Sequence, residues 1–190
     1  MQDHCDPLAA YQTTSPVESV YAWLGNPQVR LSIVMVLLLC GAVALLYGHS
    51  LQYPFVFDDR PFFTEPNLRQ YGESFFHFDL RWFAYASLGW TYQLFGLDIT
   101  ALRWGNIVLH SITASVLFVF FPRLLQLTNI ATDAKPANYT AFLLALAFAV
   151  HPVAVYGVAY LVERSIIMAT LFGVMYLLCY PHGILRDRGK

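Results

Sequence analysis

The sequence predicts an all-α integral membrane protein with about four transmembrane helices and an outer loop that carries interfacial amphipathic helices. Of its 190 residues, 57% are hydrophobic and only 12% are charged, whereas a soluble domain carries about 25% charged residues. The charged residues also leave four long uncharged windows, at 31–57, 104–122, 136–162 and 165–185. A helix crosses a bilayer core about 30 Å thick with roughly 20 apolar residues, so each window is long enough to hold a span.

The charge and cysteine content exclude two classes of function. Eleven Lys and Arg against twelve Asp and Glu give a net charge of -1, so no basic surface is available to bind a nucleic acid. Cys5, Cys40 and Cys179 are widely spaced and form no metal-binding motif. We interpret the cysteines as small hydrophobic residues. Because the sequence also lacks GxGxxG, GxxxxGK(S/T) and HExxH motifs, we expect neither a metal nor a cofactor.

The first half of the chain contains two of the expected spans. A cytoplasmic segment, 1–29, lacks the basic start of a cleavable signal peptide, so the first span, 31–47, is expected to remain as an anchor. The second span is expected at 104–121, closed by Pro122. Between them lies an outer loop, 48–103. Its stretch 82–97 is rich in Trp, Tyr and Phe, which is typical of a helix on the membrane surface.

The window 136–162 would make a single helix about 40 Å long, which is too long for one span. We expect the bend at His151 and Pro152, because proline removes a backbone donor and clashes with the preceding turn. The third span is then 137–150, followed by an elbow at 151–164, a fourth span at 165–180 and a cytoplasmic tail at 181–190.

The distribution of basic residues predicts the orientation of these spans. Six lie on one side: Arg30, Arg123, Lys135, Arg186, Arg188 and Lys190. Three lie near span ends on the other: Arg60, Arg103 and Arg164. The positive-inside rule therefore predicts cytoplasmic N and C termini, with the long loop and the elbow on the periplasmic or ER-luminal side.

Two adjacent carboxylates, Asp58 and Asp59, follow the first span by about ten residues. Such a pair above a bilayer suits general-base work on an acceptor hydroxyl or stabilisation of an oxocarbenium-like sugar. The alternative is a solvated turn in which an aspartate pairs locally with Arg60. Composition alone favours the turn.

Several polar residues fall near or within the other spans. Asn106 and His110 lie on one face of the second span, where a functional role and structural helix pairing are both open. His151 stands at the predicted break, and Glu163 and Arg164 stand at the head of the fourth span. Arg164 could bind a phosphate bidentately there, and the alternative is a charged anchor at the membrane surface.

Three stretches together resemble one family. FVFDDRPFFTEPN is similar to the first outer-loop signature of the transmembrane and tetratricopeptide-repeat O-mannosyltransferases and their bacterial relatives, which belong to the GT-C superfamily of membrane glycosyltransferases. The stretch from Arg81 through WGNIVLH, and AFAVHPVAVYGVAYLVERSIIMATLF, resemble two further motifs in the same order and spacing. The resemblance covers about 50–180 and implies a GT-C-like transmembrane domain over 30–180.

The resemblance implies a transferase that moves a sugar from a polyprenyl-phosphate carrier to an acceptor hydroxyl on the outer face. Asp58 and Asp59 would be the catalytic acidic pair, and Arg164 and His151 would bind the donor phosphate. The supporting residues would be Arg81, Asn106, His110 and Glu163. We expect one of the aspartates within about 10 Å of Arg164, at a cavity between the first, third and fourth spans.

Three positions depart from the family pattern: Tyr156 replaces a Glu, Arg103 replaces a His and Trp82 replaces a Pro. Four spans are also fewer than the family's transferase domain has. The chain is therefore expected to be a partial or split transferase. The alternative is a catalytically degenerate accessory or structural subunit of a larger membrane complex. Either reading predicts contacts with lipid and with other membrane protein chains.

Overall fold

The fold was analysed in a computed structural model that describes residues 23–56, 58–64, 67–73, 79–128, 130 and 134–187. All regular structure in these residues is helical, as the sequence predicts. The chain divides into two compact units, 1–35 and 36–190.

In the first unit, helix α2 (Pro27–Tyr47) begins, and it continues into the second unit. The Asn26 side chain accepts a hydrogen bond from the Gln28 N–H at 2.9 Å, which satisfies one of the free donors at the start of the helix. The end of α2 agrees with the predicted end of the first span. A short 3-10 helix, η1 (Gly48–Gln52), extends it.

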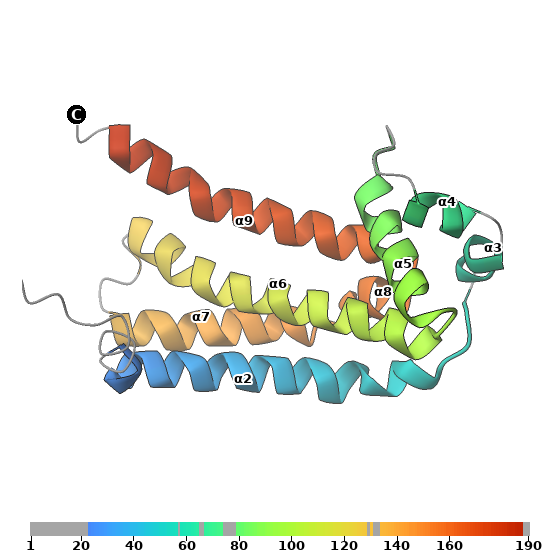
Figure 1. Ribbon diagram of the computed structural model, residues 1–190. Coiled ribbons are helices and arrows are strands. Elements are labelled where there is room, and N and C mark those ends of the chain that lie inside the picture. The colour runs from blue at the N-terminus through green and yellow to red at the C-terminus, as the bar shows by residue number, and fades with distance from the viewer. Residues whose placement is uncertain are drawn as a thin grey trace, which may run out of the picture. The chain divides into compact units, whose positions relative to one another are not determined.

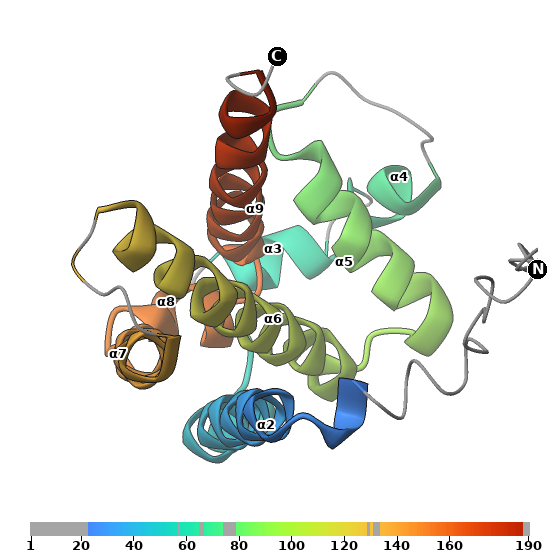
Figure 2. The same ribbon diagram turned by 90° about the vertical axis from the view of Figure 1, so that its left-hand side faces the viewer.

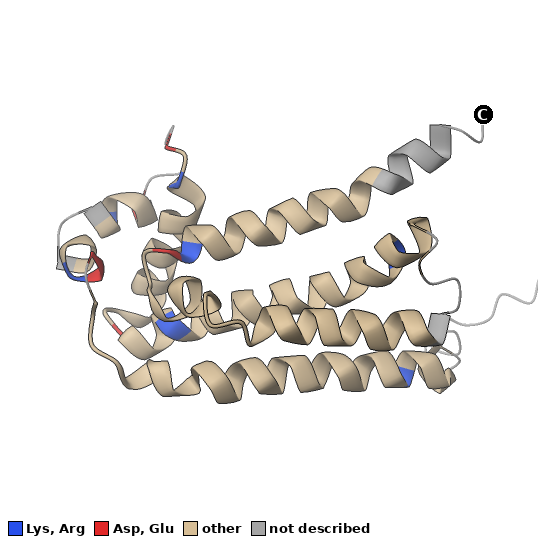
Figure 3. Cartoon of the chain, turned by 180° about the vertical axis from the view of Figure 1, so that it is seen from behind, with Lys and Arg blue, Asp and Glu red and all other residues tan. Residues whose placement is uncertain are grey.

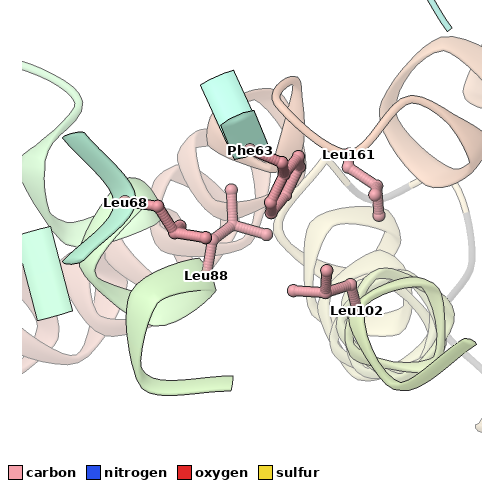
Figure 4. Packing of buried hydrophobic residues seen from close by; sticks show 5 residues of the cluster. All are labelled: Phe63, Leu68, Leu88, Leu102 and Leu161. Atoms are coloured by element: carbon pink, nitrogen blue, oxygen red, sulfur yellow. The ribbon is translucent and has the colours of Figure 1, made fainter. Parts of the chain in front are cut away.

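The outer loop folds into α3 (Asp59–Thr64), α4 (Asn67–Glu73) and α5 (Trp82–Phe95). Helices α4 and α5 approach each other closely at two glycines: a Cβ added to Gly89 would lie 2.6 Å from the backbone nitrogen of Gly72. Phe63, Leu68 and Leu88 form a buried cluster with Leu102 and Leu161, which ties the loop to later parts of the chain (Figure 4). The predicted surface stretch 82–97 is therefore a helix, packed on its neighbours through small residues.

Helix α6 (Ile99–Leu127) is longer than the predicted second span. The Asp98 carboxylate starts it, accepting hydrogen bonds from the N–H groups of Thr100 and Ala101. The prediction that Pro122 closes this helix is wrong, because the helix continues through Pro122 to Leu127. Helix α6 lies between α7 (Ala134–Ala149) and α9 (Arg164–Asp187) and packs against both (Figures 1 and 2).

The predicted break at His151 and Pro152 is confirmed. Helix α7 ends at Ala149, and a short helix, α8 (Ala154–Ala159), forms the elbow before α9 begins at Arg164. A glycine in the elbow allows α8 to approach α9, since a Cβ on Gly157 would lie 2.9 Å from the Ile167 side chain. Helix α9 runs to Asp187, beyond the predicted end of the fourth span at 180.

Two helical stretches within the described residues are long and apolar enough to cross a membrane, Pro27–Gln52 and Ile99–Leu127. Pro136–Ala149 and Arg164–Tyr180 are apolar but shorter. The middles of α6, α7 and α9 carry no charged side chain, and charges gather around α3, α4, α5 and α8 (Figure 3). The helices thus have an uncharged middle region and one end rich in charged residues, and the candidate site lies at that end.

Candidate functional site

Asp58 and Asp59 are adjacent in sequence but occupy opposite environments. Asp59, the first residue of α3, is fully buried, and its carboxylate accepts hydrogen bonds from the N–H groups of Val162 at 3.0 Å and Leu161 at 3.4 Å. Asp58 is exposed, and its own N–H donates to the Tyr160 hydroxyl at 3.2 Å. One carboxylate therefore fastens the outer loop to the elbow, and the other faces outward.

The environment of Asp59 changes its acidity. Burial raises the pKa of this carboxyl. The backbone N–H groups of Val162 and Leu161 and the positive charge of Arg103 lower it. Desolvation is the largest of these effects. A catalytic base must reach the hydroxyl that it deprotonates, and the buried Asp59 carboxyl does not reach the surface. We therefore interpret Asp59 as a structural residue.

Arg164, the first residue of α9, is 2% exposed and makes hydrogen bonds through all three of its guanidinium nitrogens. Nε donates to the Asn106 side-chain oxygen at 2.6 Å, Nη2 to the Leu102 carbonyl at 2.7 Å and Nη1 to the Ser87 hydroxyl at 3.1 Å. Gly105 makes room for it, since a Cβ there would lie 2.6 Å from Nη2. The guanidinium thus joins α5, α6 and α9.

Asn106 completes this arrangement by capping α8. Its side-chain N–H groups point to the carbonyls of Gly157 at 3.2 Å and Val158 at 3.3 Å, near the end of that short helix. The last carbonyls of a helix have no partner within the helix and need one elsewhere. Asn106 supplies this partner and also accepts a hydrogen bond from Arg164. One fully buried side chain therefore bonds both the end of α8 and the start of α9.

Arg103 holds the chain that leads from η1 to Asp58. It is fully buried and donates through Nη1 to the Tyr53 carbonyl and through Nη2 to the Pro54 carbonyl, the latter at 2.8 Å. Its Nε has no hydrogen-bond partner among the described residues. Arg103 therefore anchors the outer loop through hydrogen bonds to backbone carbonyls of that loop.

His110 and Tyr47 stabilise the end of α7. The buried His110 contacts the Ala149 carbonyl through Nε2 at 3.0 Å, and Tyr47 donates to the same carbonyl at 3.3 Å. Their rings meet edge-on at 5.5 Å. These contacts satisfy backbone that the Pro152 break leaves unpaired, which favours the structural reading of His110.

His151 is exposed, and its Nδ1 accepts the N–H of Val153 at 3.2 Å. It lines a cavity of about 590 Å³ with His110, Phe148, Tyr156 and residues of α9. The walls of this cavity come from α6, α7, α8 and α9. We expected a cavity between the first, third and fourth spans, whereas this one is lined by the second span, α6, and not by the first. A smaller cavity of about 240 Å³ lies against Tyr53, Val56, Tyr156 and Tyr160.

The two remaining predicted residues lie on the polar end. Arg81 is exposed and donates to the Tyr85 hydroxyl at 3.3 Å. This hydrogen bond raises the pKa of Arg81, and the negative charge of the half-buried Glu163 raises it further. Glu163 directly precedes the buried Arg164. No cluster of His, Cys, Asp and Glu that could hold a metal is found among the described residues.

Sequence reasoning missed three residues of this site: Tyr160, Ser87 and Arg103 as an anchor. Tyr160 and Ser87 carry no motif signal, because their partners lie 102 and 77 positions away in the chain. Arg103 gave a detectable signal, since an arginine beside an apolar window must find partners within the protein. Asp59, Asn106 and Arg164 were found, and the structure links all three to the elbow.

Comparison of this chain with protein-family models, with curated proteins and with solved structures gives no match. The candidate site is therefore interpreted from its own geometry.

Proposed function

We propose that this chain supplies the acid-bearing part of a GT-C-type membrane glycosyltransferase. It would use a polyprenyl-phosphate-linked sugar and glycosylate an acceptor hydroxyl on the outer face of the membrane. The observation that supports this proposal is the different environment of the two aspartates: Asp59 is buried and bonded to the backbone, and Asp58 beside it is exposed. A fold that needed only an anchor at this position would not require the second carboxylate.

The proposal places the protein in a membrane with four crossings, by α2, α6, α7 and α9. The length and apolar character of α2 with η1 and of α6 support it. Helices α7 and α9 add apolar stretches free of charged residues, and the break at Pro152 sets the depth at which α7 ends. Asp58, the elbow and α5 then share the outer side, and the termini of the chain are cytoplasmic.

The chemistry follows from an exposed carboxylate near an apolar cavity. Asp58 takes the proton of the acceptor hydroxyl while the oxygen of that hydroxyl forms a bond to the anomeric carbon of the sugar. The bond from the anomeric carbon to the phosphate oxygen breaks. The lipid phosphate leaves with the electron pair. Of the two residues expected to bind the phosphate, His151 is exposed and lines the cavity of about 590 Å³, whereas Arg164 is buried and bonded to Asn106, Ser87 and Leu102.

A transfer assay in proteoliposomes tests the proposal. The full chain is incubated with radiolabelled polyprenyl-phosphate hexoses and a panel of hydroxyl acceptors, and the transferred label is counted. We expect Asp58→Asn to lower the rate by roughly 100-fold or more, as for loss of a general base. Glu73→Gln, which removes an exposed carboxylate on α4, is the matched control and should transfer at the wild-type rate.

The burial of Arg164 favours a second candidate, an accessory or structural subunit without catalytic activity. A guanidinium bonded to Asn106, Ser87 and Leu102 cannot also meet a donor phosphate in this arrangement. This reading predicts a well-folded wild-type chain that transfers no label from any donor. Partner chains would then remain bound during gentle detergent extraction, and the measured mass would exceed 21.6 kDa.

A further inference from the structure

Tyr160, the first residue beyond α8, reaches Asp58 from across the fold. It follows α8 with extended backbone, and its ring packs edge-on against Tyr156 at 6.2 Å. Its hydroxyl accepts the Asp58 N–H at 3.2 Å, over a separation of 102 residues. A contact this distant in sequence joins the acidic pair to the elbow at a second point, beside the Asp59 carboxylate.

A tyrosine hydroxyl that accepts one hydrogen bond can still donate its own O–H. Burial, with the charge of the Asp58 carboxylate and its hydrogen bond to the hydroxyl, raises the pKa of Tyr160, while the Asp58 N–H lowers it. The phenol therefore keeps its proton at neutral pH. Its O–H can donate a hydrogen bond to the Asp58 carboxylate while its oxygen accepts from the Asp58 backbone N–H.

Tyr160 connects Asp58 to a cavity. The smaller cavity, of about 240 Å³, is lined by the rings of Tyr53, Tyr156 and Tyr160 with the aliphatic Val56, Val155 and Ala159. Val56 lies two residues before Asp58 in the chain. Asp58 is bonded through its backbone N–H to Tyr160 of this tyrosine-lined cavity, so its carboxylate lies where a substrate hydroxyl entering the cavity could be deprotonated.

Different hydrogen bonds hold the two aspartates, so a substitution can remove the bond of Asp58 without removing those of Asp59. The Asp59 carboxylate accepts from Leu161 and Val162 and fixes the outer loop on the elbow. Those two bonds remain when the Tyr160 hydroxyl is removed. Loss of the hydroxyl therefore changes the orientation of Asp58 and leaves the loop attached.

We infer that Tyr160 is a positioning residue for the transfer proposed above, on which this inference rests: its hydroxyl orients the Asp58 carboxylate toward the tyrosine-lined cavity. Without it the carboxylate samples several rotamers, and fewer of them are productive for proton removal. We expect Tyr160→Phe to lower kcat by roughly tenfold, because small misplacements of a reacting group are costly. KM should change little, since the ring that lines the cavity stays.

The experiment compares the wild type, Tyr160→Phe and the control Tyr176→Phe in the same proteoliposomes. Tyr176 is an exposed tyrosine on α9, so its variant should match the wild type. Transfer kinetics and the unfolding midpoint are measured together. Separately, the rate at which a carbodiimide and an amine modify Asp58 is followed by peptide mass spectrometry, which does not depend on transfer activity.

The expected result is an unchanged midpoint, a roughly tenfold lower kcat and faster modification of Asp58 in Tyr160→Phe alone. Equal kcat and equal modification in Tyr160→Phe and the wild type would overturn the inference while leaving the transferase proposal intact. A wild type that transfers nothing would refute the proposed function. Modification of Asp58 would still decide whether Tyr160 restrains it.

Discussion

Replacing Asn106 by leucine tests the idea that the elbow is held by buried polar contacts. Asn106→Leu keeps a side chain of similar size but removes the acceptor of Arg164 and the donors to the carbonyls of Gly157 and Val158. Each orphaned carbonyl costs about 1 kcal/mol, and the buried guanidinium, left without an acceptor for Nε, costs about 2 kcal/mol. The expected loss is about 4 kcal/mol in the free energy of unfolding.

The measurement is reversible unfolding in detergent micelles, followed by far-UV circular dichroism as the denaturant is increased. Ser111→Ala, on the same helix, is the control, because its hydroxyl bonds only the Ile107 carbonyl of its own helix at 2.9 Å among the described residues. That control should stay within about 0.5 kcal/mol of the wild type.

A double variant makes the test sharper. Adding Arg164→Met to Asn106→Leu removes the uncompensated charge, so about half of the lost stability should return. A loss below about 1 kcal/mol in Asn106→Leu would refute the reasoning. A double variant less stable than the single one would refute it as well.

Three further predictions follow from the same contacts. Gly105→Ala should destabilise the protein by about 1–3 kcal/mol because its Cβ would lie 2.6 Å from the bonded Arg164 guanidinium, whereas Gly173→Ala, with nothing within 4 Å, should not; thermal unfolding compares them. The difference in unfolding free energy between the wild type and Asp59→Ala should narrow as the pH rises, because burial raises the pKa of Asp59. The contribution of Asp59 to stability is full below the ordinary carboxyl pKa and is lost as the pH rises through the raised pKa. Unfolding is measured at several pH values, and a difference that widens with pH would contradict the prediction. A single cysteine placed in α4 should react with a membrane-impermeant reagent from the outer side alone, and labelling from the cytoplasmic side would overturn the topology.

The sequence predicted the helical elements well where apolar windows and breakers agree. The windows located the main helices, and Pro152 marked the end of α7 because a proline just beyond a helix cannot continue it. Pro122 misled the prediction of α6, which accommodates the proline and ends five residues later. A charge-free window fixes the existence of a helix better than its ends, since capping residues such as Asp98 lie outside the window.

The sequence singled out polar residues that the structure brings together, but it did not predict their different environments. Adjacent carboxylates look equivalent in a sequence, and only the approach of the elbow makes Asp59 buried and leaves Asp58 exposed. Arg164 was expected to face a phosphate, yet its partners on α5 and α6 lie 58 to 77 residues away. Such partners depend on how helices pack, which local patterns do not determine.

The most direct test of the account compares Asp58→Ala with Asp59→Ala, measuring sugar transfer and unfolding on the same preparations. Asp58→Ala should keep the stability of the wild type within about 0.5 kcal/mol and lose transfer by roughly 100-fold or more. Asp59→Ala should lose about 2 kcal/mol of stability, because the N–H groups of Leu161 and Val162 lose their acceptor. An Asp58→Ala variant that unfolds as readily as Asp59→Ala, or transfers sugar at the wild-type rate, would contradict the central claim that one carboxylate holds the fold and the other performs the chemistry.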